Sequence, residues 1–207
     1  MLTEFTLTLF VFSDKIMVVF KRPAEECSGT DPEGAAVKNG GNGMKKIGIV
    51  MGSDSDLPVI KKATDQLTRL GIPFEVHVYS AHRTPVEARD FALNARKAGF
   101  GVIIAAAGMA AHLAGAIAAN TTLPVIGIPC QGPVMDGLDA LLSTVQMPTG
   151  IPVATVAVNG GANAALLAAQ ILAVEDAELA AKLDEKRAKD AAAVLEKDAG
   201  IAARLES

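Results

Sequence analysis

The segment Ser80–Pro85 places a side chain that can transfer protons directly beside one that can bind an anion. Histidine titrates near neutral pH, so the imidazole of His82 is suited to general acid and general base catalysis. The planar guanidinium of Arg83 can bind a phosphate or carboxylate through paired hydrogen bonds. Ser80 and Ala81 precede them in the same loop and belong to the same candidate site. The alternative interpretation is a solvated loop that only caps the following helix.

A second candidate lies in Gly52–Pro58, where a predicted strand leads into a predicted helix. The free N–H groups at a helix start bind phosphate, Gly52 lets a ligand approach the backbone, and Ser53 and Ser55 offer hydroxyls. Asp56 can hold a ribose hydroxyl. The loop has neither the Gly-Lys-Ser/Thr of a P-loop nor a GxGxxG pattern, which disfavours nucleoside triphosphates and dinucleotides. The alternative is that Ser55 or Asp56 is simply the N-cap of the helix.

A third candidate, Ala107–Leu113, follows another predicted strand and consists mostly of small residues. Gly108 and Ala110 leave backbone N–H groups accessible around a narrow pocket, of a size suited to CO2 or a carboxylate. His112 can serve as a second polar contact there. Small residues in this segment also fit close packing of a helix on the sheet, and the two interpretations are compatible.

The alternation of short apolar runs with helical patterns indicates how these three segments are positioned. The sequence predicts strands at 46–51, 74–79, 102–107, 124–129 and 153–158. It predicts helices at 57–70, 84–99, 138–145 and 162–172, an Ala-rich helix after Gly108, and a long C-terminal helix at 176–196. Strands separated by single helices favour a parallel sheet covered on both faces. The expected fold is an α/β, three-layer, flavodoxin-like sandwich with its ligand beyond the carboxyl ends of the strands.

The helix after His82 has the clearest predicted start. Thr84 is the expected N-cap, Pro85 takes the first helical position, and Glu87 completes a capping box. These signals place the candidate loop directly before a helix N-terminus.

Residues 1–43 are expected to be an extension outside the fold, and 44–207 a single α/β domain. The first twenty residues are apolar, but Glu4 stands where a signal peptide has positive charge, and Asp14-Lys15 interrupts the run. The interruption also argues against a membrane span, which needs about 20 largely apolar residues. Residues 21–43 are polar and Gly-rich, as in a disordered linker. The alternative is that 5–20 forms a hairpin or an association surface.

The composition excludes several classes of protein. The net charge of −4, without clustered Lys and Arg, argues against a nucleic-acid binder. Aromatic residues make up 4% of the chain, too few to sandwich a flavin ring. A receiver domain needs an Asp at the end of the third strand, where Ala107-Gly108 stands. The two cysteines, Cys27 and Cys130, fit neither a metal site nor a disulfide framework and favour a reducing compartment.

Six motifs resemble the phosphoribosylaminoimidazole carboxylase catalytic subunit family, whose bacterial members are N5-carboxyaminoimidazole ribonucleotide mutases. They are Met51-Gly52-Ser53-Asp54-Ser55-Asp56, Ser80-Ala81-His82-Arg83-Thr84-Pro85, Ala110-Ala111-His112-Leu113, Leu138-Asp139-Ala140-Leu141-Leu142-Ser143, Gln146-Met147-Pro148 and Asn163-Ala164-Ala165-Leu166-Leu167-Ala168. The resemblance covers about 45–172 and continues more loosely into the C-terminal helix. Six motifs in family order are a specific signal, whereas GSxSD alone is a weak one.

The resemblance implies an isomerase of purine biosynthesis that converts N5-carboxyaminoimidazole ribonucleotide to 4-carboxy-5-aminoimidazole ribonucleotide. It implies that Ser53, Asp56 and Arg83 bind the phosphate and ribose of the substrate. CO2 leaving the substrate would be held near 108–111, and His82 would supply and then remove the protons. No metal, ATP or organic cofactor is expected. Also implied are a cytoplasmic homo-octamer whose neighbouring subunits complete each site, no contact with nucleic acid or membrane, and a functional link to N5-carboxyaminoimidazole ribonucleotide synthase.

Two positions depart from the family pattern. Ala114 stands where Pro is common, and the turn Asn159-Gly160-Gly161 is shorter than usual. The closest rival activity is that of the related carboxylase, which uses free CO2 and aminoimidazole ribonucleotide. Members of that branch tend to carry Lys where Arg83 stands and to lack Ala-Ala-His-Leu, so this chain resembles the mutases more. A non-catalytic nucleotide-binding module on the same fold is the other alternative.

Overall fold

The computed structural model describes residues 6–12, 15–21, 44–201 and 205. The chain divides into two compact units, Met1–Gly43 and Met44–Ser207. In the first unit, strands β1 (Thr6–Phe12) and β2 (Lys15–Lys21) pair antiparallel, which is the hairpin alternative for this segment. The linker expected to follow them falls, from residue 22, outside the described residues.

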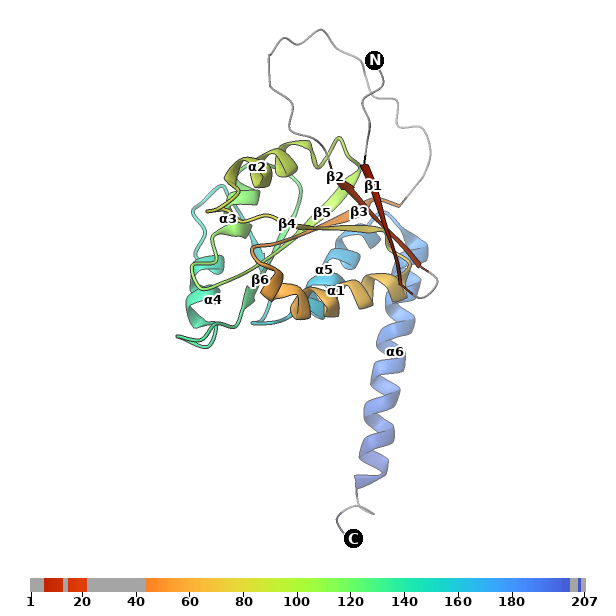
Figure 1. Ribbon diagram of the computed structural model, residues 1–207. Helices are drawn as coiled ribbons and strands as arrows, with labels where there is room; N and C mark the ends of the chain where they lie inside the picture. Colours follow the sequence, from red (N-terminus) through yellow and green to blue (C-terminus); the bar gives the residue numbers. More distant parts are fainter. Residues whose placement is uncertain (1–5, 13–14, 22–43, 202–204, 206–207) are drawn as a thin grey trace. The chain divides into compact units, whose positions relative to one another are not determined.

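A five-stranded parallel sheet forms the centre of the second unit (Figure 1). Its strands are β3 (Lys46–Met51), β4 (Phe74–Val78), β5 (Phe100–Gly108), β6 (Val125–Cys130) and β7 (Ala154–Thr155). They are hydrogen-bonded in the order β4-β3-β5-β6-β7, and every neighbouring pair is parallel. Counted within this unit the order is 2-1-3-4-5, as in flavodoxin-like folds, so the predicted fold class is confirmed.

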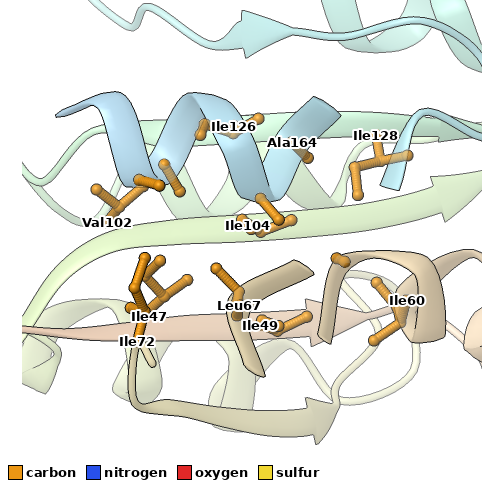
Figure 2. Packing of buried hydrophobic residues seen from close by; sticks show 14 of the residues in the cluster. Ile47, Ile49, Ile60, Leu67, Ile72, Val102, Ile104, Ile126, Ile128 and Ala164 are labelled. Atoms are coloured by element: carbon orange, nitrogen blue, oxygen red, sulfur yellow. The ribbon is translucent and has the colours of Figure 1, made fainter. Parts of the chain in front are cut away.

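One face of this sheet packs against α1 (Leu57–Leu70) and α5 (Gly161–Ala173). Ile47 and Ile49 of β3 are fully buried in the core that these elements share (Figure 2). The first helix ends where predicted, at Gly71, whose φ of 74° is a left-handed conformation that glycine adopts without strain. This packing fixes α1, and with it the loop that enters α1 from β3.

The long C-terminal helix is confirmed as α6 (Ala177–Ala199). Its N-cap is Asp176, whose carboxylate accepts a hydrogen bond from the backbone N–H of Leu179 at 2.9 Å. Leu179 and Leu183 are its buried side chains, and they join the core beside α5. The helix is therefore held to the sandwich by its first turns.

The other face of the sheet is covered by α2 (Pro85–Asn94), α3 (Leu113–Ala118) and α4 (Leu138–Val145). Val50 of β3 and Ile103 of β5 are fully buried in the core on this side. Strand β5 therefore contributes buried side chains to both faces, as predicted from its apolar run.

The capping box predicted at the start of α2 is wrong. Pro85 does begin the helix, but the Thr84 side chain makes no cap hydrogen bond. Its hydroxyl instead accepts from the backbone N–H of Ser80 at 2.8 Å and donates to the Ser80 carbonyl at 3.2 Å. The helix also ends at Asn94 rather than near Gly99, and residues 95–99 form turns. Thr84 thus stabilises the loop before the helix rather than the helix itself.

Strand β7 is shorter than the predicted 153–158. Only Ala154 and Thr155 pair with β6, at Ile126 and Gly127. The backbone then leaves the ladder, and the N–H of Asn159 returns to bond the carbonyl of Pro129 at 2.9 Å. An edge strand needs few ladder bonds, so apolar patterning overstates its length.

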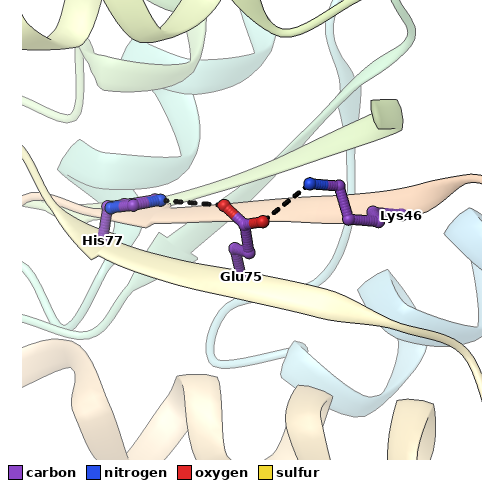
Figure 3. Close-up of polar contacts among 3 residues, drawn as sticks. All are labelled: Lys46, Glu75 and His77. Atoms are coloured by element: carbon purple, nitrogen blue, oxygen red, sulfur yellow. Dashed lines mark hydrogen bonds and ion pairs between the residues drawn. The ribbon is translucent and has the colours of Figure 1, made fainter. Parts of the chain in front are cut away.

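A row of polar side chains lies on β3 and β4 of the five-stranded sheet (Figure 3). Lys46 Nζ is 2.7 Å from a Glu75 carboxylate oxygen, and the other oxygen is 3.7 Å from His77 Nε2. The His77 ring stacks on Tyr79, with ring centroids 5.2 Å apart, and also contacts Phe91 of α2. Burial lowers the pKa of His77 below its ordinary value of 6.5, against a smaller opposing effect of Glu75. His77 therefore belongs to the packing of an edge strand.

Candidate active site

The three candidate segments meet at the carboxyl edge of the sheet, where the strand order reverses between β3 and β5. Ligands of open α/β sheets bind at such a reversal. Two backbone hydrogen bonds hold the strand ends together: Gly52 N–H donates to Ala106 O, and Tyr79 N–H donates to Met51 O, each at 3.0 Å. The loops after β3, β4 and β5 therefore start from one rigid edge.

The loop that carries His82 is organised around Ser80. The Ser80 hydroxyl accepts hydrogen bonds from the backbone N–H groups of His82 at 3.3 Å and Arg83 at 3.2 Å. Thr84 holds the Ser80 backbone from the other side. Ala81 packs partly into the core, whereas His82 and Arg83 are exposed. Both functional side chains thus project from a fixed turn into solvent.

His82 lies against His112, which comes from the segment after β5. Nε2 of His82 is 2.9 Å from Nδ1 of His112, and the two rings meet edge to face at 84°. One of these nitrogens donates and the other accepts, so the pair shares a single proton at this contact. The structure therefore joins two imidazoles that lie thirty residues apart in the chain.

A compact turn presents His112. It begins at Met109, a residue with a side chain in the left-handed conformation at φ 54°. The carbonyl of Met109 accepts from the N–H of Ala111 at 2.9 Å, and that of Ala110 accepts from the N–H of His112 at 2.8 Å. Ala111 is buried and anchors the turn, while Ala110 is exposed at its tip. Gly108 precedes it, and a Cβ there would lie only 3.3 Å from the Cys130 carbonyl oxygen.

Arg83 connects the second loop to the first. Its Nη2 donates to the carbonyl oxygen of Gly52 at 2.8 Å. The adjacent Ser53 hydroxyl accepts from Ser55 N–H at 3.3 Å and donates to Asp54 at 3.1 Å, so Ser53 caps the short helix η1 (Asp54–Asp56). The guanidinium and the start of η1 and α1 therefore lie side by side, which is an arrangement suited to a phosphate.

Asp56 differs from its neighbours because it is buried, with 8% of its surface exposed. Burial raises the pKa of its carboxyl group, opposed by a hydrogen bond with the Cys130 side chain and one with the Ser53 backbone. Burial, the charge of Asp56 and their shared hydrogen bond raise the pKa of the Cys130 thiol to about 12. The thiol thus stays protonated beside Asp56. Its sulfur also lies 3.8 Å from the Ile128 carbonyl oxygen, to which it can donate.

A cavity of about 340 Å³ lies elsewhere, between α5 and α6. Gln170, Leu183 and Arg187 are among the residues that line it, and no candidate site residue does. Within the described part of the chain, no three His, Cys, Asp or Glu side chains lie close enough to hold a metal ion. At the carboxyl edge, the paired imidazoles can transfer a proton, and Arg83 and the backbone amides can bind an anion.

The sequence pattern of the family described as AIR carboxylase matches residues 46–193, which include all of these loops. This chain belongs to the AIR carboxylase family.

A Thermotoga maritima protein named N5-carboxyaminoimidazole ribonucleotide mutase is 51% identical over 163 residues, covering 79% of this chain and 93% of that protein. A Saccharomyces cerevisiae protein named phosphoribosylaminoimidazole carboxylase is 52% identical over 151 residues, covering 73% of this chain and 26% of that protein. The crystal structure of Treponema denticola PurE is similar at a TM-score of 0.66 and 30% identity, covering 74% of this chain and 96% of that one.

In this AIR carboxylase family member, sequence reasoning missed the residues at the ends of β6 and β7. Cys130 ends β6 and contacts Asp56, and Gln131 and Asn159 follow the two strands and bond each other. One signal was available: in a parallel sheet all carboxyl ends share an edge, so residues after the fourth and fifth predicted strands also border the site. No local pattern indicates the contact of His82 with His112.

No helix within residues 44–201 combines the length and the apolar character that a membrane span requires.

Proposed function

We propose that this AIR carboxylase family member is an N5-carboxyaminoimidazole ribonucleotide mutase, an isomerase that forms 4-carboxy-5-aminoimidazole ribonucleotide in purine biosynthesis. The observation that carries the proposal is the contact of His82 with His112 at 2.9 Å, beside an arginine and a helix start. Such a site can bind a phosphate and move a proton. The similarity to the Thermotoga maritima relative that bears this name extends over most of both chains.

The substrate phosphate would bind to Arg83, Ser53 and Ser55, next to the N–H groups at the start of η1 and α1. Asp56 would accept a hydrogen bond from a ribose hydroxyl, held in orientation by Cys130. The half-buried Ser80 and Ala81 would form the wall beside the ring. These contacts bind substrate and transition state alike, so they chiefly affect KM.

His82 would carry the proton in two steps. In the first, its imidazolium gives a proton to N5 while the bond from N5 to the carboxylate breaks, which releases CO2 and leaves aminoimidazole ribonucleotide. In the second, C4 of the ring attacks CO2, and the now neutral imidazole takes the proton that C4 loses. The two steps together neither gain nor lose a proton. Between them, CO2 would be kept near Gly108, Ala110 and His112, which raises its effective concentration at C4.

The protein would work as a homo-octamer in the cytoplasm, where purine precursors are made. The exposed apolar side chains Leu138, Leu142 and Val145, on one side of α4, support burial against another subunit. Leu138 follows the carboxyl end of β6, so a neighbour there would border the site. The enzyme would receive its substrate from N5-carboxyaminoimidazole ribonucleotide synthase, without nucleic acid, membrane or cofactor taking part.

Direct carboxylation is the second candidate, and the Saccharomyces cerevisiae relative named phosphoribosylaminoimidazole carboxylase favours it. The two candidates differ in the carbon source. The purified chain is given either N5-carboxyaminoimidazole ribonucleotide, or aminoimidazole ribonucleotide with bicarbonate, both without ATP, and the 4-carboxylated product is measured. Rapid formation from the first substrate at low bicarbonate supports the mutase. Formation from the second alone supports the carboxylase, and no product from either supports a non-catalytic binding module.

A further inference from the structure

Gln131, Asp136 and Asn159 bond one another across the loops that follow β6 and β7, and the reaction described above leaves them without a role. The side-chain oxygen of Asn159 accepts from the Gln131 backbone N–H at 3.0 Å, and its amide donates to the Gln131 side-chain oxygen at 3.1 Å. The Gln131 amide nitrogen donates in turn to an Asp136 carboxylate oxygen. These three residues are named the amide bridge.

The amide bridge joins two residues of left-handed backbone conformation. They are Asp136 at φ 53° and Asn159 at φ 57°, and Asp and Asn adopt this conformation more readily than other residues with a side chain. Gln131 and Asp136 are exposed, and hydrogen bonds in contact with water contribute little net free energy. The turn at each of these residues and the hydrogen bonds between them therefore give the loop a defined shape.

The loop 131–137 that the amide bridge closes lies against the turn that carries His112. A Cβ built at Gly132 would be 3.5 Å from Met109 Cγ and 3.9 Å from the Met109 backbone nitrogen. Met109 is the strained first residue of that turn, and its carbonyl accepts the hydrogen bond that closes it. Displacing the loop from Met109 would therefore free the turn and change where His112 stands relative to His82.

We propose that Asn159 is a positioning residue: through Gln131 it fixes the loop 131–137 against Met109 and thereby holds His112 in contact with His82. The inference rests on the proposed function, since it assigns the amide bridge to the proton-transfer half of the site. The phosphate-binding half, at Arg83 and Gly52, is held by separate contacts. Loss of the amide bridge should therefore slow the reaction more than it weakens binding.

Asn159→Gly is the informative variant, because it removes both side-chain bonds while glycine accepts the positive φ. Its kcat is expected to fall about tenfold or more, with KM changed by less than about threefold. Asn159→Asp keeps the oxygen that accepts from Gln131 N–H and should lose less. Asn94→Gly is the control, since Asn94 is exposed at the end of α2, and its kinetic constants should match those of the wild type.

A second readout does not depend on turnover. The chain has three histidines, so imidazole nitrogen resonances can be assigned in the labelled full-length protein. Asn159→Gly should shift the signals of His82 and His112 and leave that of His77, which lies on β4, unchanged. Unchanged His82 and His112 signals, or an unchanged kcat, overturn the inference, and so does a kcat loss matched by loss of folded protein. A wild-type chain inactive on both substrates overturns the proposed function instead, and the resonances then decide the positioning role alone.

Discussion

His82 Nε2 and His112 Nδ1 stand 2.9 Å apart, so the imidazole that is proposed to transfer protons has a hydrogen-bond partner within the protein itself. Because only one of the two facing nitrogens carries the shared proton, the contact orients the His82 ring and couples its tautomer to that of His112. Substrate must replace or extend this contact to reach His82. The pair is therefore the first target for substitution.

His82→Asn should fold normally and lose about 10²–10⁴-fold in kcat, because a positioned proton carrier contributes on that order. His112→Asn should lose less, since it leaves the His82 imidazole in place. Steady-state rates for both variants, with circular dichroism as the check on folding, measure this. Near-wild-type turnover of His82→Asn would falsify its assignment as the proton carrier.

Arg83→Lys should raise KM well above its effect on kcat. Lysine keeps the charge but cannot bond Gly52 O and a phosphate oxygen together through one planar group. Arg83→Ala should be worse, because the phosphate is then left with hydroxyls and backbone amides. Arg89→Lys on the exposed side of α2 is the matched control. A large fall in kcat at constant KM would instead assign Arg83 to the reacting carboxylate.

His77 should make the fold less stable in mild acid. Its pKa is lowered by burial, so below about pH 6.5 the unfolded chain binds a proton that the folded chain resists, and the free energy of unfolding falls. His77→Phe keeps a ring against Tyr79 and Phe91 but cannot titrate. Urea unfolding at about pH 7.5 and about pH 5.5 should therefore show a smaller difference for the variant. Equal differences in both proteins contradict the prediction.

Gly161→Ala should destabilise the protein by about 1–3 kcal/mol, the usual range for overpacking. A Cβ at Gly161 would overlap the carbonyl oxygen of Val59, where α5 crosses α1. Gly200→Ala is the control, because the nearest atoms to its Cβ are at 3.7 Å, an ordinary contact. Chemical denaturation of both variants tests this, and equal stability would show that the two helices separate without cost.

Removal of residues 1–43 should leave fold, assembly and activity unchanged, because the sheet, both cores and all candidate site residues belong to 44–207. Circular dichroism, size-exclusion chromatography and the product assay on the truncated chain measure the three properties. Insoluble or dissociated protein would show that the hairpin of β1 and β2 is part of the assembly.

Local patterns predicted most of the fold. The bounds of α1 and the stop at Gly71 follow from apolar spacing and one glycine, both of which are local features of the sequence. Thr84 shows where such reasoning fails. Its hydroxyl could bond the new helix or Ser80, and the path of the loop in space decides between them.

The sequence predicted each loop of the candidate site separately, but not the contacts between side chains of different loops. His82 and Arg83 could be found because their residue types suit the chemistry and a strand precedes them. That His82 meets His112, and Asp56 meets Cys130, depends on how adjacent strands align at the sheet edge. The separation of the two residues along the sequence gives no information about either contact, so both contacts had to be found in the structure.

The raised pKa of the Cys130 thiol makes it possible to follow motions at the carboxyl edge of the sheet, where β6 ends. Thiol reagents attack the thiolate, and with a pKa raised to about 12 the Cys130 side chain is almost entirely un-ionised at neutral pH. While Asp56 and the end of β6 stay packed, Cys130 is therefore almost inert to alkylation. The rate at which Cys130 is labelled therefore reports how often this edge of the sheet opens, without any probe having to be introduced.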